Sequence, residues 1–182
     1  MKKNIILAGG CFWCIQADLA SFPGVLSALS GYTGGSAETA HYEDVASRKT
    51  KHREAVSIDY DSEKATFKDL VHFFLDHIDP SDGGGQFYDR GYQYEPCLYW
   101  TTEEEKNTCE ESLQELRESG LYEKVSVHIE KASSFFVAED YHQDYALQNK
   151  EHYDAYKKAS GRETFVQKTC ALREDKKIIW KK

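Results

Sequence analysis

The chain has 182 residues, 40% of them hydrophobic, and its 31 acidic and 23 basic side chains give a formal net charge of −8 at pH 7. A chain of this length can form one domain with a complete hydrophobic core, and its acidic balance argues against a nucleic-acid-binding surface, which would be basic. Its apolar runs are too short for a signal peptide or a membrane span, and its five cysteines, an odd number, indicate reduced thiols, so we expect a cytoplasmic protein without membrane contact.

The first expected element is a buried strand over residues 5–8, where four apolar residues follow one another. Gly9 and Gly10 allow a sharp turn after this strand, and residues 15–22 can form a helix. Cys11 would then lie on the first helical turn, where unpaired backbone N–H groups and the helix dipole favour a thiolate.

A second thiol, Cys14, follows three residues later on the same face of this helix. Phe12 and Trp13 stand between the two cysteines, and aromatic side chains are costly to expose unless they line a pocket. The stretch is typical of a nucleophilic thiol, an apolar pocket and a resolving thiol.

A lone Cys-x-x-Cys pair also fits half of a zinc site or two unrelated buried thiols. A zinc site usually needs a second pair of ligands, and the other cysteines, Cys97, Cys109 and Cys170, are isolated in the sequence. From the residues alone we rank redox chemistry at Cys11 first, buried structural thiols second and zinc last.

The middle of the chain carries alternating strand and helix signals. We expect a short strand over 25–30, a glycine-rich loop over 31–36 and an irregular segment over 37–47. Residues 54–60 alternate apolar and polar side chains, which predicts a strand, and residues 66–77 place apolar side chains at helical spacing, which predicts a helix.

A long loop over 79–93 is rich in glycine, aspartate and aromatic residues, and loops of this length are often functional. Beyond it we expect a strand over 97–100, a helix over 102–118, a strand over 125–129, a largely helical segment over 140–158 and a C-terminal tail after about residue 163. The whole chain, 1–182, is thus predicted to be a single α+β catalytic domain, with helices packed on a mixed or antiparallel sheet whose topology stays open.

Eight short motifs, in order along nearly the whole chain, resemble those of the A-type peptide methionine sulfoxide reductases, the MsrA family. They are Gly10-Cys11-Phe12-Trp13, Gly31-Tyr32-Thr33-Gly34-Gly35, Tyr42-Glu43-Asp44-Val45, His52-Arg53-Glu54-Ala55-Val56, Gly84-Gly85-Gln86-Phe87-Tyr88-Asp89-Arg90-Gly91, Gln93-Tyr94, Ala138-Glu139-Asp140-Tyr141-His142-Gln143-Asp144-Tyr145 and Ser160-Gly161-Arg162.

The resemblance implies reduction of methionine S-sulfoxide, free or in proteins, to methionine, and hence protein repair after oxidative damage. It implies a two-layer α/β sandwich with the reactive cysteine at a helix start after the first strand, which agrees with the elements expected above. It implies no metal and no organic cofactor, and thioredoxin as the source of electrons. We expect a monomer.

The resemblance also assigns roles to residues. Cys11 would attack the sulfoxide sulfur, and Glu54 would protonate the sulfoxide oxygen, provided that shielding by aromatic side chains raises its pKa. Without the family match, Glu54 would be interpreted as an exposed charge at a strand end.

The substrate would contact five further side chains. Phe12 and Trp13 would form the apolar wall around the methyl group, Tyr42 and Tyr94 would hydrogen-bond the sulfoxide oxygen, and Asp89 would order the site. Tyrosines at these positions could instead be aromatic residues at the edge of the core.

After the first step, a second thiol must condense with the sulfenic acid on Cys11. Many family members have glycine in place of Cys14 and use cysteines near the C-terminus. We favour Cys14 because its spacing permits a disulfide, and keep Cys170 as the alternative. Lys51 and Glu95-Pro96 also depart from the family pattern but replace no proposed catalytic group.

Two other functions remain open at this point. Cys11 and Cys14 could form a general thiol–disulfide oxidoreductase, although the downstream motifs would then have no role. The aromatic residues could also form a methionine-binding module in which Cys11 is inert.

Overall fold

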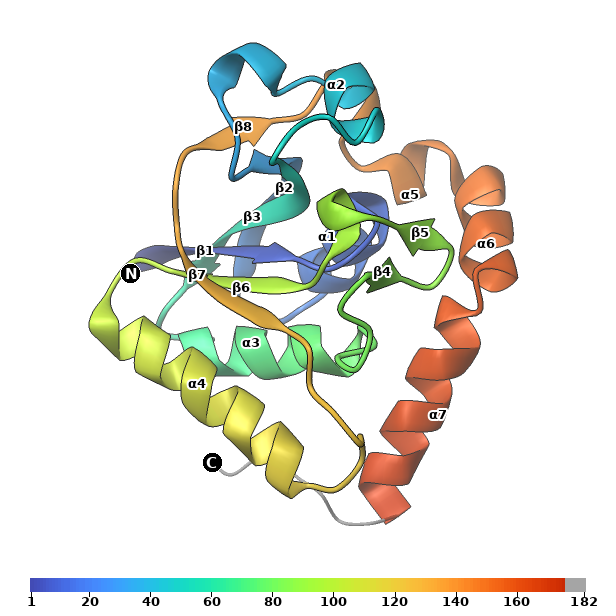
Figure 1. Cartoon of the computed structure of the whole chain (residues 1–182). Coiled ribbons are helices and arrows are strands. Elements are labelled where there is room, and N and C mark those ends of the chain that lie inside the picture. The colour runs from blue at the N-terminus through green and yellow to red at the C-terminus, as the bar shows by residue number, and fades with distance from the viewer. Residues whose placement is uncertain (176–182) are drawn as a thin grey trace.

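Six strands form one mixed sheet, in the spatial order β7-β6-β1-β3-β2-β8 (Figure 1). The computed structural model describes residues 1–175. The strands are β1 (Lys2–Ala8), β2 (Val25–Thr33), β3 (Arg53–Asp61), β6 (Cys97–Trp100), β7 (His128–Lys131) and β8 (Phe135–Val137). Neighbouring strands are antiparallel except β6 and β7, which are parallel. The mainly antiparallel character agrees with the prediction.

The remaining elements surround this sheet (Figure 1). They are the helices α1 (Phe12–Ala20), α2 (Tyr42–Ala46), α3 (Phe67–Asp76), α4 (Glu103–Glu118), α5 (Tyr145–Gln148), α6 (Lys150–Ala159) and α7 (Arg162–Asp175), the 3-10 turns η1 (Ala37–Thr39), η2 (Tyr92–Tyr94) and η3 (Asp140–His142), and a hairpin of β4 (Gly85–Gln86) and β5 (Asp89–Arg90).

The main core lies between one face of the sheet and helices α1, α3 and α4. Leu7 from the sheet, Ile15 from α1, Leu70 from α3 and Leu113 from α4 are all buried in it. Apolar residues at helical spacing bury the inner faces of these helices, and this burial is the main source of their stability.

The opposite face of the sheet has a smaller core. Ile6, Ala55 and Tyr99 are buried there, and Ala132 and Phe135 from the segment that links β7 to β8 pack against them. The helices of the main core therefore form one layer and the sheet the other, which confirms the predicted α+β sandwich.

Thr66 and Thr102 are the N-cap residues immediately before helices α3 and α4, and each forms a capping box with Asp69 or Glu105, respectively. In a capping box the hydroxyl accepts from a backbone N–H of the first turn and the acidic side chain accepts in return, so orphaned donors are satisfied. The predicted starts of both helices are correct.

Several expectations were wrong in detail. The strand expected over 125–129 lies at His128–Lys131, because its position depends on pairing with β6 and not on its own alternation. The segment 37–47 contains η1 and α2, and β2 extends through the first residues of the expected loop. Strand β8 was missed because only three residues pair with β2, too few for a recognisable pattern.

The region expected as a C-terminal tail contains α7, which packs against α6 and α3.

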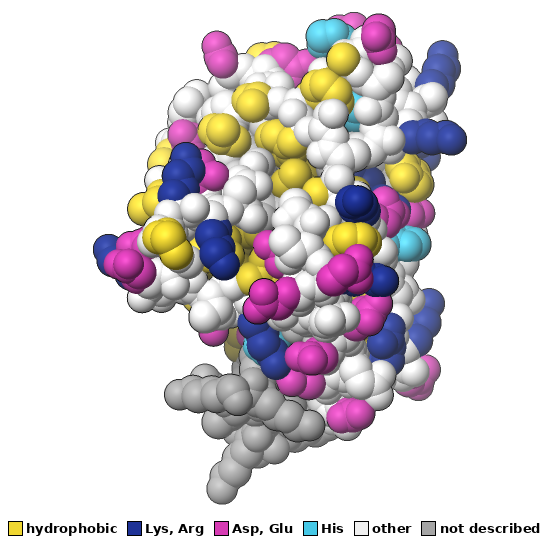
Figure 2. Space-filling model, turned by 90° about the vertical axis from the view of Figure 1, so that its left-hand side faces the viewer, with side chains coloured by type: hydrophobic (Ala, Val, Ile, Leu, Met, Phe, Trp, Pro, Cys, Tyr) yellow, Lys and Arg dark blue, Asp and Glu magenta, His cyan; other side chains and the backbone are white. Residues whose placement is uncertain are grey.

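Acidic and basic side chains are intermixed on the face of the molecule that Figure 2 shows. Within residues 1–175, no helix has the length and hydrophobicity needed to cross a membrane.

Candidate functional site

The turn between β1 and α1 brings Cys11 beside the loop that follows α3. Gly10 has a φ of 85°, and a Cβ there would lie 2.6 Å from the Cβ of Gln86, so the position requires glycine on both counts. The Gly10 N–H donates to the carbonyl oxygen of Tyr94 over 3.1 Å. Cys11 is the N-cap residue immediately before α1, at the helix start but not within the first turn where its spacing placed it.

A pocket of about 70 Å³ opens beside Cys11. It is lined by Cys11, Phe12, Trp13, Tyr42, Glu54, Asp89, Tyr94 and Tyr156. The proposed nucleophile, the proposed acid and the five proposed substrate-binding side chains thus lie around one small cavity, although they come from five separate parts of the sequence. Tyr156 is the one lining residue that the sequence analysis did not name.

Glu54 projects from β3 into the interior and is buried. Its Oε2 accepts a hydrogen bond from the Phe12 N–H over 3.1 Å. Burial raises the pKa of Glu54 to about 8; the nearby Asp89 charge also raises it, while the Phe12 N–H and the Tyr94 hydroxyl act in the opposite direction. Glu54 is therefore protonated in most molecules at neutral pH, and the alternative of an exposed strand-end charge is wrong.

The two thiols of the Cys-x-x-Cys pair, Cys11 and Cys14, are buried together in a cluster with Tyr153. Burial raises the pKa of Cys11 well above its ordinary value, as do its hydrogen bond with Cys14 and the charges of Glu54 and Asp89. The hydrogen bond donated by Cys11 lowers the pKa of Cys14. The ionisation of each thiol therefore depends on that of the other.

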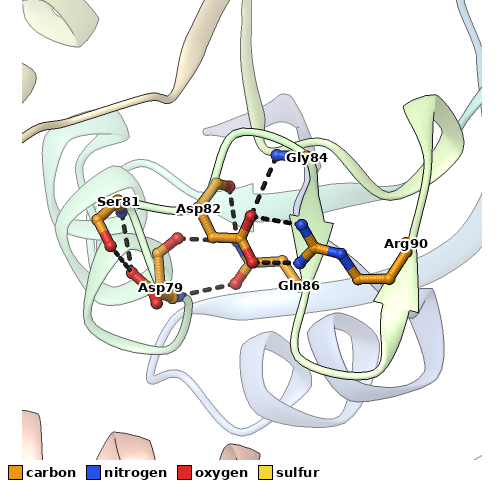
Figure 3. A network of polar contacts seen from close by, with 6 residues as sticks. All are labelled: Asp79, Ser81, Asp82, Gly84, Gln86 and Arg90. Carbon is orange, nitrogen blue, oxygen red and sulfur yellow. Dashed lines mark hydrogen bonds and ion pairs between the residues drawn. The ribbon is translucent and has the colours of Figure 1, made fainter.

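Asp89 is held from two sides. The Tyr156 hydroxyl of α6 donates a hydrogen bond to its Oδ2, and burial raises its pKa. The backbone of Asp89 belongs to the β4-β5 hairpin. Side-chain contacts hold in place the loop that leads into this hairpin (Figure 3). There the Gln86 side chain accepts from the Asp79 N–H over 2.7 Å and donates to the Asp79 carbonyl over 2.8 Å. Arg90 pairs with Asp82 in the same loop.

Trp13 is fixed as a flat wall of the pocket. Its ring stacks on Tyr145 with centroids 3.8 Å apart and planes 8° from parallel. Its Nε1–H donates to Nδ1 of His142 over 3.1 Å. His142 also lies against the Tyr42 ring, with centroids 4.6 Å apart, and Glu139 accepts from the Tyr42 N–H over 2.9 Å.

Sequence reasoning therefore missed four supporting residues, Glu139, His142, Tyr145 and Tyr156. The first three belong to a motif that was recognised without a role for its members. Tyr156 could have been suspected only from the number of aromatic residues in the polar segment 140–158.

The other cysteines differ in setting. Cys97 and Cys109 are buried, and burial raises the pKa of each to about 12, so neither is a reactive thiol at neutral pH. Cys170 is exposed on α7, and the buried cluster around Cys11 contains Cys14 and not Cys170. No group of three or more histidine, cysteine or acidic side chains suited to a metal ion occurs within residues 1–175.

The two departures from the family pattern lie outside the pocket lining. Lys51 is exposed just before β3. Glu95 follows η2, and its carboxylate lies 3.6 Å from buried Arg53 and 3.3 Å from His128. Glu95 therefore helps to anchor the turn that carries Tyr94.

The chain is similar to known proteins over nearly its whole length. The family model described as "Peptide methionine sulfoxide reductase" matches residues 3–174. Peptide methionine sulfoxide reductase MsrA 2 of Staphylococcus aureus is 41% identical over 167 residues, which cover 91% of this chain and 94% of that protein. MsrA of Bacillus velezensis is 43% identical over the same shares of the two chains.

Solved structures have the same fold. Reduced Mxr1 from Saccharomyces cerevisiae is 26% identical with a TM-score of 0.76, covering 81% of this chain and 86% of that one. Methionine sulfoxide reductase A of Corynebacterium diphtheriae is 27% identical with a TM-score of 0.71, covering 81% and 75%. Mxr1 in complex with Trx2 is 21% identical with a TM-score of 0.56, covering 80% and 85%, and shares the fold. From the family match and these relatives, the chain belongs to the peptide methionine sulfoxide reductase family.

Proposed function

We propose that this protein reduces methionine S-sulfoxide, free or within proteins, to methionine, and so repairs oxidised proteins. The observation that carries the proposal is that Cys11 and a buried Glu54 line one small pocket. Sulfoxide reduction needs a sulfur nucleophile and a proton for a poor leaving oxygen within one water-poor site, and this pocket offers both.

In the first step the Cys11 sulfur, as its thiolate, attacks the sulfoxide sulfur. Glu54 donates a proton to the sulfoxide oxygen, and the hydroxyls of Tyr42 and Tyr94 hydrogen-bond that oxygen. Phe12 and Trp13 surround the methyl group and exclude water. The protonated oxygen passes from the substrate sulfur to the Cys11 sulfur, the bond between the two sulfurs breaks, and methionine leaves, so that Cys11 becomes a sulfenic acid.

The protonation states of Cys11 and Glu54 depend on each other. An ionised Glu54 opposes ionisation of Cys11, because two negative charges would share a buried site. Protonated Glu54 removes that opposition. The thiolate is therefore formed most readily in the same state that has a proton ready for the substrate oxygen.

Cys14 then condenses with the sulfenic acid to form a Cys11–Cys14 disulfide, with Cys170 as the alternative partner. The shared buried cluster of Cys11 and Cys14 supports Cys14. Thioredoxin restores the thiols by exchange. Support for this reductant comes from the family and from yeast Mxr1, which was solved in complex with Trx2.

The whole chain works as one catalytic domain and as a monomer in the cytoplasm. The odd number of cysteines, five, supports a reducing compartment, because a regular disulfide framework would need an even number.

The test follows reduction of the separated S and R epimers of N-acetyl-methionine sulfoxide, with dithiothreitol as reductant, by the wild type and by Cys11→Ser. Turnover of the S epimer alone, abolished by the substitution, is the expected result. Failure of the folded, reduced wild type to turn over either epimer would overturn the proposal. Disulfide reduction without sulfoxide turnover would then favour the general oxidoreductase, and binding without turnover the methionine-binding module.

A further inference from the structure

Arg162, a buried arginine at the start of α7, contacts α1 one helical turn after Cys14. Arg162 is 2% exposed, and its Nη2 donates to Oδ2 of Asp18 over 2.7 Å. Asp18 follows Cys14 by four residues in α1, so the two side chains are neighbours on one helix face. The guanidinium thus reaches the side of α1 on which Cys14 lies. The motif Ser160-Gly161-Arg162, recognised in the sequence without any role, places it there.

The contact with Asp18 satisfies only part of the hydrogen-bonding capacity of this guanidinium. The Nε of Arg162 is buried and has no hydrogen-bond partner among residues 1–175. A buried donor without a partner is costly, as is a buried charge, and a nearby anion would relieve both costs. The Cys14 sulfur is a candidate for that anion.

The charged and titratable groups that act on Cys14 come from both ends of the sequence and from β3. They are Cys11 immediately before α1, Asp18 of α1, Glu54 of β3, Tyr153 and Tyr156 of α6, and Arg162 of α7. The Cys11 hydrogen bond is the largest influence that lowers the pKa of Cys14, and the Arg162 charge comes next, outweighing the opposing charge of Asp18. The one cation in this set therefore acts on the proposed resolving thiol.

We propose that Arg162 is a positioning residue that stabilises the Cys14 sulfur as a thiolate, both when Cys14 closes the disulfide with Cys11 and when it leaves as that disulfide is reduced. This inference rests on the proposed function, in which Cys14 resolves Cys11.

Closure of the Cys11–Cys14 disulfide conserves atoms and charge. The Cys14 thiolate attacks the sulfenic sulfur of Cys11, an S–S bond forms, the S–O bond breaks, and the departing hydroxide takes up the proton that Cys14 had lost, giving water. In the separate reductive step one thiolate of a dithiol attacks the Cys11 sulfur, the Cys11–Cys14 bond breaks, and Cys14 departs as a thiolate. The second thiol of the dithiol then displaces Cys11 and closes the dithiol's own disulfide. Cys11 is the sulfur open to attack, because it is 9% exposed and lines the pocket whereas Cys14 is 1% exposed.

A charge effect and a merely structural ion pair predict different results in three variants. Arg162→Gln removes the cation and leaves Asp18. Asp18→Asn breaks the same pair and keeps the cation. The double variant Arg162→Gln/Asp18→Asn removes both charges and avoids an uncompensated buried carboxylate, so it remains informative if Arg162→Gln folds poorly.

The experiment mixes each reduced protein with N-acetyl-methionine S-sulfoxide in the absence of reductant and measures methionine release and disulfide formation separately. Arg162→Gln and the double variant should release methionine at the wild-type rate and close the Cys11–Cys14 disulfide roughly three- to tenfold more slowly at pH 7. Their deficit should shrink at alkaline pH, where Cys14 ionises without help. Asp18→Asn should close the disulfide at least as fast as the wild type. Reopening of the purified disulfides by dithiothreitol should follow the same order.

Equal slowing in Asp18→Asn and Arg162→Gln would overturn the inference, since a lost structural pair would then explain both. Wild-type closure in the double variant, or a disulfide mapped to Cys170, would also overturn it. A second arm forms the sulfenic acid on Cys11 with hydrogen peroxide instead of the sulfoxide. It measures closure independently of methionine release, so failure of the proposed function is distinguished from failure of the role of Arg162.

Discussion

The backbone N–H of Phe12 donates a hydrogen bond to Oε2 of Glu54 over 3.1 Å, across 42 residues of sequence. The residue that follows the proposed nucleophile thus holds the proposed acid in place. Because the donor is a backbone group, this contact does not depend on the Phe12 side chain, provided that the residue is not proline.

Replacement of Glu54 by Gln should lower the rate of methionine formation by roughly 10²–10⁴-fold, because the amide cannot supply the proton. The wild-type rate should also fall as the pH rises through about 8, where Glu54 loses that proton. The variant's residual rate should lack this alkaline limb. Profiles of kcat/KM between pH 6 and 10 check both statements, and a variant within a few-fold of the wild type would contradict the role of Glu54.

The same substitution should stabilise the fold at alkaline pH. The folded-state pKa of Glu54, about 8, lies above the value of 4.5 for a free glutamate, so the folded state binds the proton more tightly. Its contribution to stability is present below about pH 4.5 and is lost as the pH rises through about 8. Urea unfolding should show Glu54→Gln ahead of the wild type by roughly 2–4 kcal/mol at pH 8, with little difference at pH 4.5. A gap that stays constant with pH would contradict the raised pKa.

Loss of the Tyr156 hydroxyl should impair catalysis through Asp89. Tyr156→Phe removes a hydrogen bond to a half-buried carboxylate, a contact worth about 1.5–3 kcal/mol, so kcat/KM for N-acetyl-methionine S-sulfoxide should fall roughly 10- to 100-fold. Tyr88→Phe is the matched control, because Tyr88 precedes Asp89 but is 68% exposed. Equal effects of the two substitutions would rule out a specific role for Tyr156.

The stack between Trp13 and Tyr145 should support substrate binding. Tyr145→Ala removes a stacked ring and should raise KM roughly two- to tenfold, whereas Tyr145→Phe keeps the ring and should leave KM near the wild-type value. Steady-state kinetics with the S epimer measure both. An unchanged KM in Tyr145→Ala would show that Trp13 keeps its position without the stack.

Recycling should depend on Cys14 and not on Cys170. Reduced Cys14→Ser should release a single methionine per molecule and then stall with thioredoxin as reductant, because the sulfenic acid on Cys11 has no close thiol partner. Cys170→Ser should turn over at the wild-type rate. Sustained turnover by Cys14→Ser that is lost in the double variant would assign the role to Cys170.

Much of the fold follows from local patterns. The apolar residues of α3 and α4 recur at helical spacing, and Thr66 and Thr102 set the helix starts through contacts within three residues. The alternation of apolar and polar side chains over 54–60 likewise indicates β3, because it is a pattern of adjacent residues. Cys11 could also be located from the sequence, because the turn and helix start that surround it are properties of adjacent residues.

The remaining features of the site arise from contacts between residues that are far apart in the sequence. The hydroxyl of Tyr156 reaches Asp89 across 67 residues, and Arg162 reaches Asp18 across 144, so no local spacing indicates either pair. The burial that raises the pKa of Glu54 is likewise absent from its own strand, whose pattern allows an exposed end. Chain sequence specifies which groups are present and how each short segment folds; their desolvation and their partners arise only when distant segments pack, because burial and hydrogen-bond distance are properties of the packed chain.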